Sequence, residues 1–153
     1  MPFSKTSHWS IRVFLFTLPL LLVDQLTKLA LYTADINQSL IGDFIRLKLE
    51  RNTGIAFSIP LPQWFLLAII PIFILALAIF LVSHLALARW PVTLLYSLFL
   101  AGAIGNWLDR VNYGFVIDFI QIGQFPVFNL ADSFLTISIF LIIVFYDKIK
   151  RFK

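Results

Sequence analysis

Six ionisable side chains lie within or beside long apolar runs of this sequence, and they are the residues best able to perform chemistry there. They are Asp24, Lys28, Asp109, Arg110, Asp118 and Asp132. Ionisable groups are costly in a bilayer, so a functional role is the first hypothesis for them. Two carboxylates that share one proton can hydrolyse an amide, because the ionised one takes a proton from water while the protonated one donates to the oxyanion.

The pattern Asn-x-x-Asp occurs twice, from Asn106 to Asp109 and from Asn129 to Asp132. At this spacing the amide and the carboxylate share one helix face, where the amide can orient the carboxylate. Both pairs also have a purely structural interpretation. Asn129 can be a helix N-cap with Asp132 in the first turn, and Asp109 can be an ion-pair partner of Arg110.

The remaining charged positions leave two interpretations open as well. Asp24 and Lys28 are four residues apart, so on a helix they can form either a structural ion pair or a catalytic pair. Asp118 has apolar neighbours on both sides and no local basic partner, so burial should raise the pKa of its carboxyl. A solvent-facing strand position is the structural alternative for Asp118. The small residues of Ala101–Gly105 predict close helix packing.

Cysteine and histidine contribute little chemistry here. The chain has no cysteine, which excludes a thiolate zinc site and a cysteine nucleophile, and its two histidines are His8 and His84. No metal site is predicted. A serine–lysine hydrolase remains an alternative, with Lys28 as base and Ser133 or Ser58 as nucleophile. A proton-coupled transporter is a second alternative, although no inverted repeat is visible; a non-catalytic scaffold is a third, although it leaves the clustered aspartates unexplained.

The elements that position these residues are predicted to be membrane helices, because 60% of the residues are hydrophobic and only 13% are charged. Four apolar runs cover residues 12–33, 64–85, 90–109 and 129–147, each with about the 20 residues that cross a bilayer. Pro71 is expected to kink the second run. The predicted fold is therefore an all-α membrane protein with four transmembrane helices, in a single domain.

The distribution of basic residues predicts the orientation. Four crossings place both termini on one side, and positive residues favour the cytoplasmic side. The basic residues on the side of the termini are Lys5, Arg12, Arg89, Lys148, Lys150, Arg151 and Lys153. Both termini are therefore expected in the cytoplasm, with the six ionisable residues near the outer face. The net charge of +4 does not indicate nucleic acid, because most basic residues flank apolar runs.

A small outer β-sheet is predicted over residues 41–60 of the 153-residue domain (1–153). Apolar and charged residues alternate strictly through Ile45–Glu50, which is typical of a half-buried strand. Asn52, Thr53 and Gly54 favour a turn, after which Ile55–Ile59 can return as a second strand. The segment Tyr113–Phe128 is expected to be extended too.

Five motifs, in order along nearly the whole chain, resemble the lipoprotein signal peptidase (signal peptidase II) family of bacterial membrane aspartic proteases. They are Asp24–Lys28, Asn52–Phe57, Gly105–Arg110, Val116–Phe119 and Phe128–Asp132. Each motif is weak alone, but five in this order between four apolar runs are highly specific. One departure is Ala101, which stands where the family often has glycine.

The resemblance implies a catalytic dyad of Asp118 and Asp132, a choice that reasoning from the residues leaves open between Asp24, Asp109, Asp118 and Asp132. The implied supporting residues are Asp24, Lys28, Asn52, Gly54, Asn106, Asp109, Arg110, Asn129 and Ala131. The implied substrate is a prolipoprotein, cut just before a diacylglyceryl-modified lipobox cysteine at the outer face of the bacterial cytoplasmic membrane. The family implies sensitivity to globomycin and no cofactor or metal; we expect a monomer that contacts membrane lipids and no nucleic acid.

Overall fold

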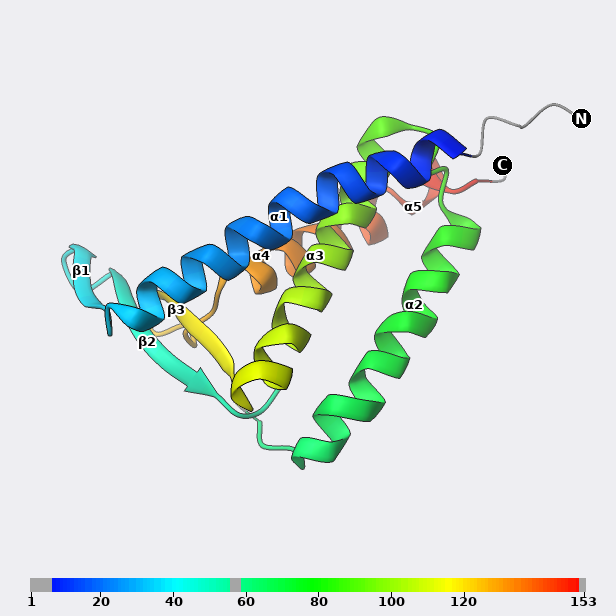
Figure 1. Ribbon diagram of the computed structural model, residues 1–153. Helices are drawn as coiled ribbons and strands as arrows, with labels where there is room; N and C mark the ends of the chain where they lie inside the picture. Colours follow the sequence, from blue (N-terminus) through cyan, green and yellow to red (C-terminus); the bar gives the residue numbers. More distant parts are fainter. Residues whose placement is uncertain (1–6, 56–58, 152–153) are drawn as a thin grey trace, which may run out of the picture.

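The computed structural model describes residues 7–55 and 59–151. Long helices lie side by side. A small sheet lies at one end of them, and the first and last described residues lie at the other end (Figure 1). The elements in chain order are α1 (Ser7–Thr33), β1 (Asn37–Ile41), β2 (Ile45–Asn52), the π-helix η2 (Phe65–Ile69), α2 (Ile70–His84), α3 (Trp90–Tyr113), β3 (Val116–Ile122), α4 (Leu130–Val144) and α5 (Tyr146–Ile149).

Within the described residues, three helices are long and apolar enough to cross a membrane: α1 from His8, η2 continued by α2, and α3. The predicted runs at 12–33, 64–85 and 90–109 are confirmed as helices, and α3 extends to Tyr113, where Gly114 adopts the left-handed conformation (φ 81°) that ends the helix. The fourth run is corrected. α4 has only 15 residues and ends at Val144, because the chain turns at Phe145 into the separate helix α5.

The helix that contains Pro71 begins with a π-helical turn over Phe65–Ile69. Proline has no N–H to donate to the carbonyl four residues earlier, and its ring crowds that carbonyl. A wider turn just before Pro71 accommodates both effects. The kink expected at Pro71 stays a prediction; the irregularity next to it is this π-helical turn.

The sheet is antiparallel, with strand order β1-β2-β3. The strand predicted at Ile45–Glu50 is confirmed as part of β2, but its partners are β1 and β3. Residues 56–58 of the predicted return strand lie outside the described residues, and on either side of them a single bridge joins Gly54 to Pro60. Of the segment Tyr113–Phe128 that was expected to be extended, only Val116–Ile122 is a strand (β3); Tyr113 still belongs to α3, and a turn begins at Gly123.

Helix α3 packs closely against both α1 and α4. A Cβ at Gly102 would lie 2.8 Å from Cγ of Leu135 in α4, and a Cβ at Gly105 would lie 2.6 Å from Oδ2 of Asp24 in α1. Both distances are shorter than side chains tolerate, so glycine is required at each contact. The prediction of close packing at the small residues of α3 is confirmed.

The two ends of the bundle are filled differently. An apolar cluster occupies the end away from the sheet, with Leu81, Leu85, Val92 and Phe99 among its buried members. The end next to the sheet instead buries polar side chains. They include Asp24, Lys28, Asn106, Asp109, Asp118 and Asn129, each at most 8% exposed. Buried polar groups need partners, and their partners define the candidate site.

Candidate active site

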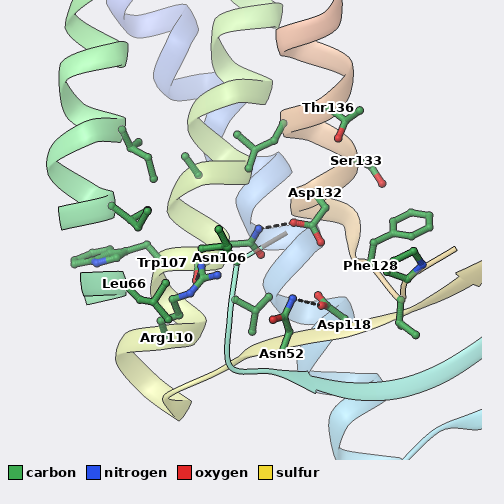
Figure 2. Close-up of a pocket in the computed structure, with 18 of the residues that line it drawn as sticks. Asn52, Leu66, Asn106, Trp107, Arg110, Asp118, Phe128, Asp132, Ser133 and Thr136 are labelled. Atoms are coloured by element: carbon green, nitrogen blue, oxygen red, sulfur yellow. Dashed lines mark hydrogen bonds between the residues drawn. The ribbon is translucent and has the colours of Figure 1, made fainter. Parts of the chain in front are cut away.

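Asp118 and Asp132 line one cavity of about 650 Å³ near the sheet end of the bundle (Figure 2). Its walls are mainly apolar side chains from η2, α2, α3, α4 and the segment that follows β3, with few polar groups among them. The polar members are Asn52, Asn106, Arg110, Asp118, Asp132, Ser133 and Thr136. An apolar cavity with a few convergent polar groups is the usual form of a binding site.

Asp132 is held in the first turn of α4 by a capping box. The side chain of Asn129 accepts a hydrogen bond from the backbone N–H of Asp132 at 2.9 Å, and Oδ2 of Asp132 accepts one from the N–H of Asn129 at 3.1 Å. The structural interpretation of Asn129 is thus confirmed. It does not exclude chemistry, because Asp132 also lines the cavity, and its Oδ1 accepts from Nδ2 of Asn106 at 2.7 Å (Figure 2).

Asp118 lies on β3 and is only 2% exposed, so the solvent-facing alternative is wrong. Nδ2 of Asn129 donates to its Oδ1 at 2.6 Å, and Nδ2 of Asn52 donates to its Oδ2 at 3.0 Å. Burial raises the pKa of Asp118 to about 7, and the negative charge of Asp132 adds to the increase; the hydrogen bonds from Asn52 and Asn129 oppose it.

Asparagine side chains connect the two aspartates. Asn129 contacts both, since its side-chain amide donates to Asp118 and its backbone N–H donates to Asp132. Asn106 connects Asp132 to a cation, because its Oδ1 accepts from Nζ of Lys28 at 3.1 Å while its Nδ2 donates to Asp132. Nδ2 of Asn129 also donates to Oδ1 of Asn106 at 3.1 Å, which makes the network continuous.

Lys28 forms a buried ion cluster with two other carboxylates. Its Nζ lies 2.9 Å from Oδ2 of Asp24 and 2.8 Å from Oδ2 of Asp109, and all three side chains are at most 1% exposed. The expected pairing of Asp109 with Arg110 is wrong, because α1 packs on α3 and places Lys28 against Asp109. With Asn106 as third acceptor, every N–H of Lys28 has a partner, which is typical of a structural cation and not of a base beside a serine.

Arg110 extends from α3 to the chain that follows β2. Its Nη2 donates to the carbonyl of Gly54 at 2.8 Å, and its Nη1 donates to the carbonyl of Asn106 at 3.1 Å. Its buried Nε has no partner among the described residues, and the side chain lines the cavity. The N–H of Gly54 in turn donates to Oδ1 of Asn52 at 2.9 Å, which orients that amide toward Asp118.

The structure therefore gathers the residues singled out from the sequence at one end of the bundle. Ala131 contributes its backbone N–H, which donates to Oδ1 of Asp24 at 2.9 Å. Ser58 lies outside the described residues, and the hydroxyl of Ser133 donates to the carbonyl of Asn129 at 3.0 Å. Within residues 7–55 and 59–151, no group of three or more histidine, aspartate or glutamate side chains is arranged to hold a metal ion.

Sequence reasoning missed Gln25. Its Nε2 donates to Oδ2 of Asp24 at 3.1 Å, to Oδ1 of Asp109 at 2.9 Å and to the carbonyl of Gly105 at 3.3 Å. The available signal was its position, since Gln25 is a polar residue between Asp24 and Lys28 in an otherwise apolar helix.

Comparison with known proteins gives consistent matches. The family described as "Signal peptidase (SPase) II" matches residues 16–147. A lipoprotein signal peptidase of Streptococcus agalactiae is 35% identical over 136 residues, 85% of this chain and 88% of the relative. One from Dehalococcoides mccartyi is 44% identical over 107 residues, 67% of each chain. A solved structure described as "Bacterial membrane enzyme structure by the in meso method at 2.3 A resolution" covers 89% of this chain and 87% of its own, at 35% identity and a TM-score of 0.79.

Proposed function

Since the chain belongs to the lipoprotein signal peptidase (signal peptidase II) family and is an aspartic peptidase that processes prolipoproteins, we propose that Asp118 and Asp132 are its catalytic dyad. One observation carries the proposal: these two carboxylates line the same cavity and are joined through Asn129. The other buried carboxylates, Asp24 and Asp109, each form an ion pair with Lys28. Among the described residues, neither dyad carboxylate forms an ion pair.

Asp132 acts as the general base and Asp118 as the general acid. In this proposal Asp132 carries the negative charge, which the positive end of the α4 helix dipole and the hydrogen bonds from Asn106 and Asn129 favour. Asp118 holds the shared proton, since burial and the charge of Asp132 raise its pKa to about 7. Titration of such a pair belongs to both groups together.

Hydrolysis proceeds by four proton transfers, two as the tetrahedral diol forms and two as it breaks down. Asp132 takes a proton from water, the oxygen of that water attacks the scissile carbonyl carbon, and Asp118 donates its proton to the carbonyl oxygen. Asp132 then passes its proton to the amide nitrogen as the carbon–nitrogen bond breaks, and Asp118 recovers a proton from the diol as the new carboxyl forms. Arg110 lines the cavity that would hold the peptide, and its hydrogen bonds to the carbonyls of Gly54 and Asn106 fix the guanidinium there.

The enzyme is a multi-pass bacterial membrane protein. In the proposed arrangement α4 completes four crossings of the cytoplasmic membrane, both termini are cytoplasmic, and the sheet lies on the outer face. A peptide with one end in lipid and one end outside fits a cavity with mainly apolar walls. The proposed substrate is accordingly a prolipoprotein with a diacylglyceryl group on its lipobox cysteine, cut just before that cysteine by a monomer that needs no cofactor.

Incubation of the purified enzyme with a diacylglyceryl-modified prolipoprotein tests this function. A gel should show conversion to the shorter form, and globomycin should block it. The matched control is the same precursor without the lipid, which should be cut far more slowly because it lacks the group that anchors it beside the dyad. Equal cleavage of both precursors would contradict the lipid requirement, and intact lipidated precursor would contradict the function.

The pH dependence of kcat should depend on Asn52. Activity should fall as the pH rises through about 7, because Asp118 then loses the proton that it donates. The Asn52 hydrogen bond stabilises ionised Asp118, so Asn52→Ala should raise the pKa of Asp118 and move the fall to higher pH, by about one unit for a hydrogen bond to a charged group. Asn37→Ala, at an exposed asparagine of β1, is the matched control. A shift to lower pH in Asn52→Ala would contradict the assignment of Asp118 as the acid.

A further inference from the structure

Two carboxylates outside the proposed dyad each hold the backbone beside one dyad member. Oδ1 of Asp24 accepts from the N–H of Ala131, the residue just before Asp132. Oδ2 of Asp109 accepts at 3.2 Å from the N–H of Ile117, the residue just before Asp118. The separation of Asp24 and Asp109 therefore affects the separation of the two backbone segments that carry Asp118 and Asp132.

Two side chains of α1 join these carboxylates to each other. Lys28 pairs with Oδ2 of both, and Gln25 donates from one amide nitrogen to Oδ2 of Asp24 and Oδ1 of Asp109. The three atoms that Nε2 of Gln25 contacts are all acceptors, which determines that the NH₂ end of the amide faces them. Lys28 and Gln25 are three residues apart and so lie on the same face of α1.

Lys28 and Gln25 stabilise the contact between Asp24 and Asp109 in different ways. Lys28 supplies one positive charge, which the two buried carboxylates share. Oδ1 of Asp109 receives its hydrogen bond from Gln25, so without Gln25 this carboxylate is held through Oδ2 only and can rotate. Gln25 thus restrains the orientation of Asp109 and Asp24 without adding a charge near the dyad.

We propose that Gln25 is a positioning residue for catalysis, which holds Asp24 and Asp109 so that Ile117 and Ala131 present the dyad at a fixed separation. The proposal rests on Asp118 and Asp132 being the dyad. Gln25 does not line the cavity, so its effect should fall on kcat and leave substrate binding unchanged. A residue that only stabilised the fold would lower the amount of folded enzyme without changing kcat per folded molecule.

The first test is Gln25→Leu, assayed on the diacylglyceryl-modified prolipoprotein. We expect kcat per folded enzyme to fall by about tenfold to a hundredfold, since misplacing reacting groups by about 1 Å has effects of this size. KM should stay within about twofold, because the cavity lining is untouched. The matched control is Leu26→Ala, at a neighbouring side chain that is 61% exposed, and its kcat should equal that of the natural enzyme.

The second test is Gln25→Glu, which keeps the shape but places a third carboxyl beside Asp24 and Asp109. When ionised it repels both and donates to neither; when protonated it can donate one hydrogen bond. The kcat of Gln25→Glu relative to the natural enzyme should therefore rise as the pH falls from about 8 to about 6, since partial burial beside like charges favours the protonated form. The charged and titratable groups around this cluster are Asp24, Lys28, Asp109, Arg110, Asp118 and Asp132.

Folded Gln25→Leu with unchanged kcat, or with a raised KM alone, would overturn the positioning role. If Gln25→Leu does not fold, Gln25→Glu decides: recovery at lower pH supports the role, and a loss that does not vary with pH overturns it. Asp118→Asn and Asp132→Asn are assayed in parallel. Full activity in either of those variants would disprove the dyad itself, which is a different result from normal kcat in Gln25→Leu alone.

Discussion

Asp118→Asn and Asp132→Asn should each lower kcat for prolipoprotein cleavage by about 10⁴-fold or more, the upper end of what general acid–base groups contribute. An amide can neither accept the proton of water at Asp132 nor donate one to the carbonyl oxygen at Asp118. Each replacement keeps the shape of the side chain and leaves one oxygen to accept hydrogen bonds from the surrounding asparagines. Purified variants should therefore stay folded and still bind globomycin.

Asp43→Asn is the matched control for the dyad variants, because Asp43 lies in the β1–β2 turn with its side chain 97% exposed. It should leave kcat unchanged. That result would show that the effect of the dyad variants comes from loss of those particular carboxyl groups and not from loss of one negative charge anywhere in the protein. The measurement is initial rate at equal concentrations of folded enzyme. Turnover within tenfold of the natural enzyme in Asp118→Asn or Asp132→Asn would remove that residue from the dyad.

Lys28→Met should destabilise the protein by about 3–5 kcal/mol, the range found when one partner of a buried ion pair is removed. The substitution leaves Asp24 and Asp109 buried without a counter-charge, and it removes a hydrogen bond from Asn106. The free energy of unfolding in detergent is the measurement. Adding Asp109→Asn should restore part of the loss, because it removes one of the two uncompensated charges.

The control for this prediction is Lys48→Met. Lys48 pairs with Glu50 at 3.8 Å, but both side chains are exposed by more than 40%, so the change should stay within about 1 kcal/mol. If Lys28→Met and Lys48→Met had the same free energy of unfolding, the buried Lys28 cluster would not stabilise the fold more than an exposed ion pair does. Full cleavage activity in Lys28→Met would also exclude Lys28 as a catalytic base.

Local pattern predicted much of the fold. Long apolar runs give helices because every backbone polar group in lipid must be satisfied within the segment, and strict alternation through Ile45–Glu50 gave a strand. The partners of that strand could not be predicted, because β3 follows β2 by more than sixty residues and nothing local encodes that pairing. The end of α4 at Val144 was missed for a related reason: the turn at Phe145 packs α5 against the distant segment after α2, where Ala86 donates to the carbonyl of Ile149.

The candidate site was predicted as a gathering of residues but not as a set of contacts. The predicted membrane orientation and the predicted ends of the helices place the six ionisable groups at a similar depth in the membrane. That prediction requires no knowledge of which side chains contact each other. The choice of partner depends on how α1 rotates against α3, and that rotation pairs Asp109 with Lys28 instead of its neighbour Arg110. Gln25 was missed because an uncharged amide in an apolar helix is less conspicuous than a charge, although it has three acceptors around it.

The shortness of α4 links this enzyme to the thickness of its membrane. Fifteen helical residues extend about 22 Å, whereas the hydrocarbon core measures about 30 Å. In the proposed arrangement, with α4 as the fourth crossing, lipid around α4 must thin, or the end that carries Asp132 must sit below the level of the headgroups, at a fraction of a kcal/mol per Å of mismatch. In that arrangement, the acyl-chain length of the surrounding lipid affects how far water must travel to reach the peptide bond.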